Sequence, residues 1–209
     1  MRSGIEMQTK DNAIVKAYHQ DRIARFGQST VEALGWKNED SQRKRFQDFC
    51  DFADLNGKSV FDVGCGQADF YHFLTNRYRD FRYTGIDQSS SFLREAWHNL
   101  EGSTNAKLLL GEFGSALLPV SDFVVCIGAL NYRTSESGFI QRMISKLYGL
   151  SRLGVGLSLL KHLDAGFDNG ILVSYDPDEI FEYCQQLSGN VRMKNSPETD
   201  FFTLFLYHN

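Results

Sequence analysis

The residues best suited to chemistry lie between positions 60 and 70, where the chain reads VFDVGCGQADF. An apolar run ends here in an acid and two glycines, and an amphipathic pattern follows at once, which predicts a strand, a tight turn and a helix. Glycine is favoured where the backbone takes a positive φ or approaches a ligand closely. The unpaired N–H groups that open the following helix point toward whatever is bound at the turn.

A second strand-like run, FRYTGID at 81–87, ends in Asp87, about 20 residues beyond the glycines. This pairing suits a nucleoside, with the turn holding its polar tail and the carboxylate its ribose hydroxyls. A dinucleotide fingerprint would have a third glycine at Asp69, and it has no acid at the place of Asp62. Carboxylates repel a pyrophosphate and attract a cation, so the pattern favours a cationic nucleoside over a nicotinamide cofactor.

With Asp62 and Asp87, the glycine turn resembles the first two motifs of the class I S-adenosylmethionine (SAM)-dependent methyltransferases, whose loop reads D/E-x-G-x-G-x-G. Ala68 departs from the last glycine of that loop. The resemblance extends over roughly residues 55–130. It implies a methyl-transferring enzyme with SAM as its cofactor. The cofactor-binding residues that it implies are Asp62, Gly64, Cys65, Gly66, Asp87, Gln88, Glu112, Phe113 and Gly128.

Hydrophobic patterning along the rest of the chain predicts alternating helices and strands. The expected helices are 11–26, with Asp11 or Asn12 as N-cap, and 39–55, 69–78, 92–100, 135–150 and 178–187. The expected strands are 58–63, 82–87, 106–110, which reads as fully buried, 121–127, 153–160, 191–195 and 201–207. The resembled fold is an α/β, Rossmann-like sheet of seven strands in the order 3-2-1-4-5-7-6, with the last strand antiparallel and helices on both faces.

A chain of 209 residues fits one structural domain. Within it we expect residues 1–57 to form an N-terminal helical lid and residues 58–209 to form the methyltransferase core. By the resemblance, this lid supplies substrate contacts, which would be Tyr18, Arg22, Trp36 and Gln42, and we expect Tyr175 to reach the same pocket. The alternative is that the N-terminal helices pack on the sheet for stability alone.

Three residues at strand ends are candidates for catalysis. Asn131 and Tyr132 follow the strand 121–127, where amino-methylating members of the family carry N/D-P-P-Y/F. The prolines are missing here, so the amino-nitrogen mechanism of that subgroup is not implied, although both side chains can orient an acceptor. His162 follows the strand 153–160 and can remove an acceptor proton near neutral pH. A histidine with a structural partner or one facing water fits its position equally well.

The overall composition narrows the class of partner. A net charge of −4, with only residues 43–45 forming a basic cluster, argues against duplex nucleic acid and favours a small-molecule methyl acceptor. Four scattered cysteines without a C-x-x-C pair indicate reduced thiols and no metal site. We expect a cytoplasmic protein, because no signal sequence and no apolar stretch of ~20 residues is present.

The sulfonium of SAM already activates its methyl group, so binding and in-line alignment supply most of the catalysis. The sequence therefore predicts a SAM-dependent methyltransferase that acts on an oxygen, nitrogen or carboxylate of a small molecule. The alternative is a non-catalytic, SAM-binding interaction or regulatory protein.

Overall fold

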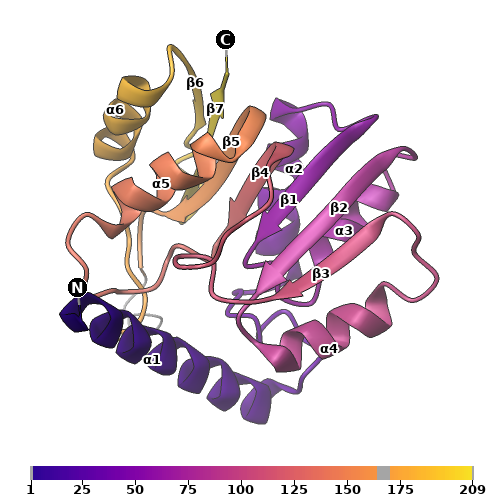
Figure 1. Ribbon diagram of the computed structural model, residues 1–209, viewed down its shortest axis with the longest axis vertical. Helices are drawn as coiled ribbons and strands as arrows, with labels where there is room; N and C mark the ends of the chain where they lie inside the picture. The colour runs from indigo at the N-terminus through magenta and orange to yellow at the C-terminus, as the bar shows by residue number, and fades with distance from the viewer. Residues whose placement is uncertain (1, 164–169, 209) are drawn as a thin grey trace.

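The computed structural model describes residues 2–163 and 170–208, which form one seven-stranded sheet with helices on both faces (Figure 1). The strands are β1 (Lys58–Val63), β2 (Phe81–Asp87), β3 (Ala106–Leu110), β4 (Ser121–Ile127), β5 (Ser151–Leu160), β6 (Asn190–Lys194) and β7 (Phe201–Tyr207). The helices are α1 (Arg2–Phe26), α2 (Glu39–Phe52), α3 (Asp69–Thr75), α4 (Ser90–Asn99), α5 (Phe139–Gly149) and α6 (Pro177–Leu187).

The strand order is β3-β2-β1-β4-β5-β7-β6, which confirms the predicted topology. The strands from β3 to β5 are parallel, and β7 runs antiparallel to both β5 and β6. Asp62 at the end of β1 pairs with Gly85 of β2 and with Val125 of β4. The carboxyl ends of three neighbouring strands therefore meet at one edge of the sheet, where open α/β folds bind their ligands.

Each face of the sheet has its own hydrophobic core. The face under α2, α3 and α4 is rich in aromatic rings, among them Phe49, Phe70 and Phe205. The face under α5 and α6 is mainly aliphatic. Gly156 of β5 lies under the ring of Phe49, and a Cβ at this position would overlap that ring. The absence of a side chain thus brings α2 close to the sheet and fixes the helix that leads into β1.

Two local predictions are wrong. The first helix begins at Arg2, and Asp11 is no N-cap, because its carboxylate accepts hydrogen bonds from Thr134 and Ser135 in the loop after β4. Strand β3 is not buried, because it is the edge of the sheet and has a partner on one side only. Its Leu110 is 67% exposed. Hydrophobic periodicity identifies a strand but does not place it within the sheet.

The two N-terminal helices lie in different places (Figure 1). Helix α2 packs on the sheet against α3 and β7. Helix α1 lies beyond the carboxyl ends of the strands, where Asp11 and His19 contact the loop after β4. The long segment before β1 therefore supplies both a layer of the core and a cover for the edge at which the site is expected.

Candidate functional site

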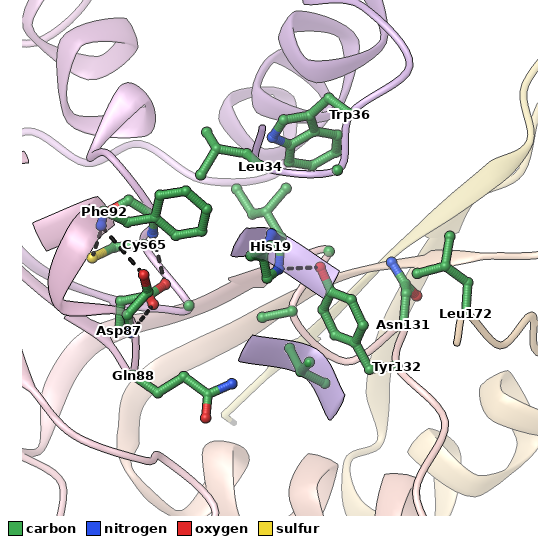
Figure 2. Close-up of a pocket in the computed structure, with 18 of the residues that line it drawn as sticks. His19, Leu34, Trp36, Cys65, Asp87, Gln88, Phe92, Asn131, Tyr132 and Leu172 are labelled. Atoms are coloured by element: carbon green, nitrogen blue, oxygen red, sulfur yellow. Dashed lines mark hydrogen bonds between the residues drawn. The ribbon is translucent and has the colours of Figure 1, made fainter. Parts of the chain in front are cut away.

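A cavity of about 300 Å³ lies at the carboxyl ends of the parallel strands, with α1 and the loop at 34–37 on its other side (Figure 2). Most of the residues predicted for the site line it. These are Trp36, Gln42, Asp62, Gly64, Cys65, Gly66, Asp87, Gln88, Glu112, Phe113, Gly128, Asn131, Tyr132 and His162.

The glycine turn has the backbone geometry that its sequence suggests. Gly64 and Gly66 have φ values of +76° and +55°. A Cβ at Gly64 would overlap the methyl group of Ala129, so glycine is required for the loops after β1 and β4 to meet. The backbone N–H groups of Gly64 and Cys65 both donate to the carbonyl of Ile86, at 2.8 and 3.0 Å, which ties the turn to β2.

Ala68 takes a left-handed backbone conformation, which glycine adopts more easily, at the position of the last glycine in the resembled motif. Its φ and ψ are 63° and 30°, and among the described residues it is the one non-glycine residue with a positive φ. Its methyl group is fully buried just before α3. The left-handed conformation costs an L-residue roughly 1–2 kcal/mol, so the backbone at Ala68 is strained in this turn.

Three acids surround this turn. Asp62 is 3% exposed and accepts a hydrogen bond of 2.7 Å from the hydroxyl of Tyr83. Burial raises the pKa of Asp62 to about 7, with Asp87 and Asp69 adding to the effect. Asp87 accepts from the backbone N–H groups of Gly66 and Ser89, at 3.0 and 2.8 Å, and burial raises its pKa as well. Concentrated buried carboxylates of this kind favour a cation between them.

Asp69 is the third of these acids and connects the turn to α2. Its carboxylate accepts a hydrogen bond of 2.8 Å from the amide of Gln42. Burial raises the pKa of Asp69 too.

The part of the cavity next to the ends of β2 and β3 is lined by Gln88, Glu112 and Phe113. Glu112 accepts from the N–H groups of Gly114 and Ser115, at 2.6 and 2.8 Å, so its carboxylate also caps its own loop. The amide oxygen of Gln88 is buried and has no hydrogen-bond partner among the described residues. With the half-buried ring of Phe113 beside them, these groups offer acceptors and an apolar face to a purine base.

The residues after β4 are held more tightly than the sequence suggests. Asn131 is buried, its side-chain oxygen accepts from the N–H of Leu160 at 2.9 Å, and its carbonyl accepts from the N–H of Val173, also at 2.9 Å. It therefore joins the ends of β4 and β5 to a later loop. His162 is exposed at the rim, and its backbone N–H donates to the carbonyl of Asp200.

Three predicted substrate contacts lie outside the cavity lining formed by the described residues. Tyr18 is buried on α1. Arg22 donates to the carbonyl of Glu32, and its guanidinium lies 5.5 Å from the centre of the Tyr18 ring. Tyr175 donates to the carbonyl of Leu130 at 2.7 Å. The polar groups of Arg22 and Tyr175 are therefore already hydrogen-bonded to other parts of the chain.

His19 lines the cavity but was not predicted from the sequence. Its Nδ1 lies 3.0 Å from the carbonyl oxygen of Ala33, and its Nε2 lies 2.8 Å from the hydroxyl of Tyr132 (Figure 2). Burial lowers the pKa of His19 to about 4. No local motif marks this histidine, because its partners come from a loop 14 residues away and from the loop after β4, 113 residues away.

Arg45 is a second cavity-lining residue that the sequence does not predict. It is 4% exposed and lines the cavity, with its guanidinium 4.9 Å from the centre of the Trp36 ring and 4.3 Å from that of Phe201. One Nη lies 3.5 Å from Asp200, and Nε has no hydrogen-bond partner among the described residues. Burial lowers its pKa to about 10, so the group stays charged at neutral pH. One feature of the sequence could have indicated its burial: Arg45 lies on the same face of the helix as Gln42, Phe46 and Phe49.

Two kinds of feature are absent from the described part of the chain. No cluster of three or more histidine, cysteine or acidic side chains there has an arrangement that could hold a metal ion. None of the helices formed by residues 2–163 and 170–208 has the length and apolar character to cross a membrane.

Comparison with known sequences gives a consistent assignment. Residues 60–150 match a family model described as a methyltransferase domain. A protein of Mycobacterium tuberculosis, provisionally named a methyltransferase, is 28% identical over 134 residues, which cover 61% of this chain and 79% of that protein. Carboxy-S-adenosyl-L-methionine synthase of Campylobacter jejuni is 35% identical over 96 residues, which cover 43% of this chain but only 38% of that enzyme.

Solved structures share the fold across nearly the whole chain. Magnesium protoporphyrin IX methyltransferase from Synechocystis with bound SAH aligns with a TM-score of 0.71 and 15% identity, over 95% of this chain and 100% of that one. The same enzyme with bound SAM gives a TM-score of 0.67 at 17% identity, over 95% and 97% of the two chains. Residues 60–150 thus match a methyltransferase domain, and the strand order is that of the class I S-adenosylmethionine-dependent methyltransferase fold.

Proposed function

We propose that this methyltransferase transfers the methyl group of SAM to a small-molecule acceptor bound beneath α1. The observation that carries the proposal is the distribution of charge in the cavity. Asp62, Asp69 and Asp87 line its β1 and β2 side, and the buried Arg45, with Asp200 3.5 Å away, lines the side toward β7. SAM has the complementary pattern, because its sulfonium and ammonium are cations and its carboxylate is an anion.

This arrangement supports one placement of the cofactor. Asp87 would accept from the ribose hydroxyls, since its two oxygens are fixed by backbone N–H groups. The adenine would lie toward Gln88 and Phe113, and the methionine part would pass over the glycine turn. Its ammonium would then be near Asp62, whose ionised form gains most from a nearby cation.

Arg45 would bind the carboxylate of the methionine part. A buried guanidinium between two aromatic rings is held in one orientation, and its Nε is a donor without a partner among the described residues. A carboxylate accepts from such a planar group with two parallel hydrogen bonds. A bound carboxylate would also remove the cost of a buried donor that lacks an acceptor.

The acceptor would lie on the other side of the methyl group. The cavity is also lined by Asn131, Tyr132 and His162, and the acceptor would lie beside these residues. We infer that residues 1–57 act as a lid through α1 and the loop at 34–37, which border the cavity, while α2 supplies Gln42 and Arg45. A covered site favours reaction because it aligns the reactants and excludes water.

Calorimetric titration of the full chain with SAM, with decarboxylated SAM and with NAD tests the proposal. We expect the protein to bind SAM and to show no binding of NAD. Arg45→Met should weaken SAM binding by roughly 10- to 100-fold, because a charged hydrogen bond contributes about 1.5–3 kcal/mol. The same change should have little effect on decarboxylated SAM, which lacks the carboxylate.

Arg43→Met is the matched control, because Arg43 is exposed on the same helix and does not line the cavity. This variant should bind SAM as tightly as the unchanged protein. A protein that binds neither SAM nor SAH would refute the function, whereas equal losses of both cofactors in Arg45→Met would refute only the role of Arg45.

A further inference from the structure

The contacts of His19 and Tyr132 determine where the protons of this pair are. A carbonyl oxygen only accepts hydrogen bonds, so the Nδ1 of His19, 3.0 Å from the carbonyl of Ala33, must be the protonated nitrogen. In a neutral imidazole the Nε2 is then an acceptor. The hydroxyl of Tyr132, 2.8 Å away, must therefore donate its single proton to His19.

The surroundings keep the pair in this state. Burial and the neighbouring Arg22 lower the pKa of His19, so the imidazole is neutral at pH 7. Burial raises the pKa of Tyr132, with Tyr18 and Asp87 adding to the effect, so the phenol keeps its proton. The ring of His19 also packs edge-on against Tyr18 and Phe92, with centroids 5.1 and 5.0 Å apart. The imidazole is thus prevented from turning away from Tyr132.

One consequence concerns the oxygen of Tyr132. Its proton is directed to His19, so the lone pairs of the oxygen are what remains for any other partner. Tyr132 is half-buried and lines the cavity just after Gly128 and Asn131, on the side of the site left for the acceptor. A group that contacts this oxygen is attracted if it donates a hydrogen bond and repelled if it can only accept one.

On the basis of the proposed function, we propose that the methyl acceptor is a hydroxyl or an amine that donates its hydrogen to the oxygen of Tyr132, and not a carboxylate. His19 is a positioning residue in this scheme, because it acts through Tyr132. The carboxylate acceptors that the sequence left open are disfavoured, since an ionised carboxylate would face the lone pairs of the phenol.

The transfer step balances with these groups. The nucleophile uses a lone pair to form its bond to the methyl carbon, and the sulfur keeps the electron pair of the broken carbon–sulfur bond as a neutral thioether. The hydrogen that faces the oxygen of Tyr132 leaves the methylated acceptor as a proton to water, and the positive charge of the sulfonium leaves with it. Tyr132 and His19 keep their own protons throughout, so both orient the acceptor.

The first test is the tautomer of His19, measured by nitrogen-15 NMR on full-length protein saturated with SAH. We expect a neutral ring with its proton on Nδ1 between about pH 6 and pH 8, whereas a free histidine titrates near pH 6.5. A proton on Nε2, or an imidazolium in this range, would overturn the proposal because Tyr132 would then be free to donate.

The second test compares phenol and benzoate as ligands of the SAH-saturated protein, with both affinities measured by calorimetric titration. Phenol should bind at least ~10-fold more tightly than benzoate, which corresponds to about 1.4 kcal/mol. Tyr132→Phe should abolish the difference, and His19→Leu should shift the preference toward benzoate because it frees the phenol proton. Tyr175→Phe, which alters a tyrosine outside the cavity lining, should keep the original preference.

Several outcomes would refute the proposal. These are an equal or reversed preference in the unchanged protein, a preference that persists in Tyr132→Phe, and the absence of any phenol binding at SAH saturation. A failure of SAH itself to bind would instead point to the proposed function, so the two hypotheses are separated by the same titration. If His19→Leu does not fold, the tautomer measurement on the unchanged protein still decides.

Discussion

Asp62, Asp69 and Asp87 line one side of a single cavity, and each has a raised pKa. Burying several carboxylates together opposes their ionisation, because each loses hydration and repels the others. A ligand with two positive charges reverses this effect. The same residues that destabilise the empty site therefore provide affinity for a cofactor with a sulfonium and an ammonium.

The first prediction concerns Asp87. Its replacement by alanine should weaken SAM binding by roughly 10- to 100-fold, since charged hydrogen bonds to the ribose contribute about 1.5–3 kcal/mol. His162→Ala should change the dissociation constant by less than about 2-fold, because His162 is exposed at the rim. Calorimetry on both variants measures the order, and a larger loss in His162→Ala would show that the ribose ligand is assigned wrongly.

A second prediction follows from the pKa of Asp62, which is about 7 in the folded protein against 3.8 for an ordinary aspartate. Between these two values the folded empty protein keeps a proton that the unfolded chain has lost, so this group lowers stability as the pH rises. Binding of a cation favours the ionised carboxylate. SAM affinity should therefore increase from pH 6 to pH 8, with release of a proton on binding.

Titration calorimetry in buffers of different ionisation enthalpy counts that proton. Asp62→Asn is the control, because it keeps the shape of the side chain and cannot titrate. Proton release of the same size in this variant would mean that another group is responsible.

At the scale of single residues, the sequence predicted those cavity-lining residues that belong to a short motif. The glycines, Asp62 and Asp87 lie at the ends of two consecutive parallel strands. Their spacing along the chain is therefore enough to predict that they lie close together. His19 and Arg45 could not be found in this way. Their partners, Tyr132 and Phe201, are distant in the sequence, and only packing brings them together.

Among the elements, the contact between the loops after β1 and β4 is the tightest constraint on the site. Gly64→Ala would add a methyl group that overlaps Ala129, at a positive φ. We expect a loss of at least about 2 kcal/mol in the free energy of unfolding, from overpacking and backbone strain together. Denaturant unfolding measures it.

Gly149→Ala is the matched control for this prediction. Gly149 ends α5, and a Cβ there has nothing within 4 Å and no positive φ to oppose it. The change should stay within about 1 kcal/mol of the unchanged protein. Equal effects of the two substitutions would contradict the close approach of the loops.

The elements themselves were largely predictable, because buried parallel strands such as β1 and β4 are dense in Val, Phe and Ile. The strand order came from the resemblance and is confirmed. The burial of β3 could not be predicted, since it depends on the missing neighbour at the sheet edge. The start of α1 was missed because Asp11 is a capping residue by type, yet its carboxylate is engaged by the loop after β4.

In the molecule as a whole, α1 reaches from one side of the cavity to the other. Its Asp11 accepts three hydrogen bonds from Thr134 and Ser135, at 2.8 to 3.0 Å. At the other end, Gln28 just after the helix donates to the carbonyl of Ser91 at 2.8 Å, beside the site expected for the nucleoside. Hydrogen bonds thus hold α1 at one end to the loop after β4 and at the other end to α4.

A further prediction tests this cover. Asp11→Ala removes the contacts on the acceptor side and should increase the rate of SAM dissociation by about 10-fold, if the lost bonds are worth roughly 1–2 kcal/mol in the closed state. Rapid-mixing displacement of bound SAM measures the rate. Asp21→Ala alters an exposed acid of the same helix, paired only with Arg25 among the described residues, and should leave the rate unchanged.

The hydrogen bonds that hold the two ends of α1 also affect how many methyl groups one acceptor receives each time it binds. One helix covers both the cofactor and the acceptor sides, so the motion that lets spent cofactor leave also uncovers the methylated product. We expect product and SAH to depart in the same opening. An acceptor with several methylatable positions would then be modified distributively, with partly methylated molecules accumulating in solution before the fully methylated one.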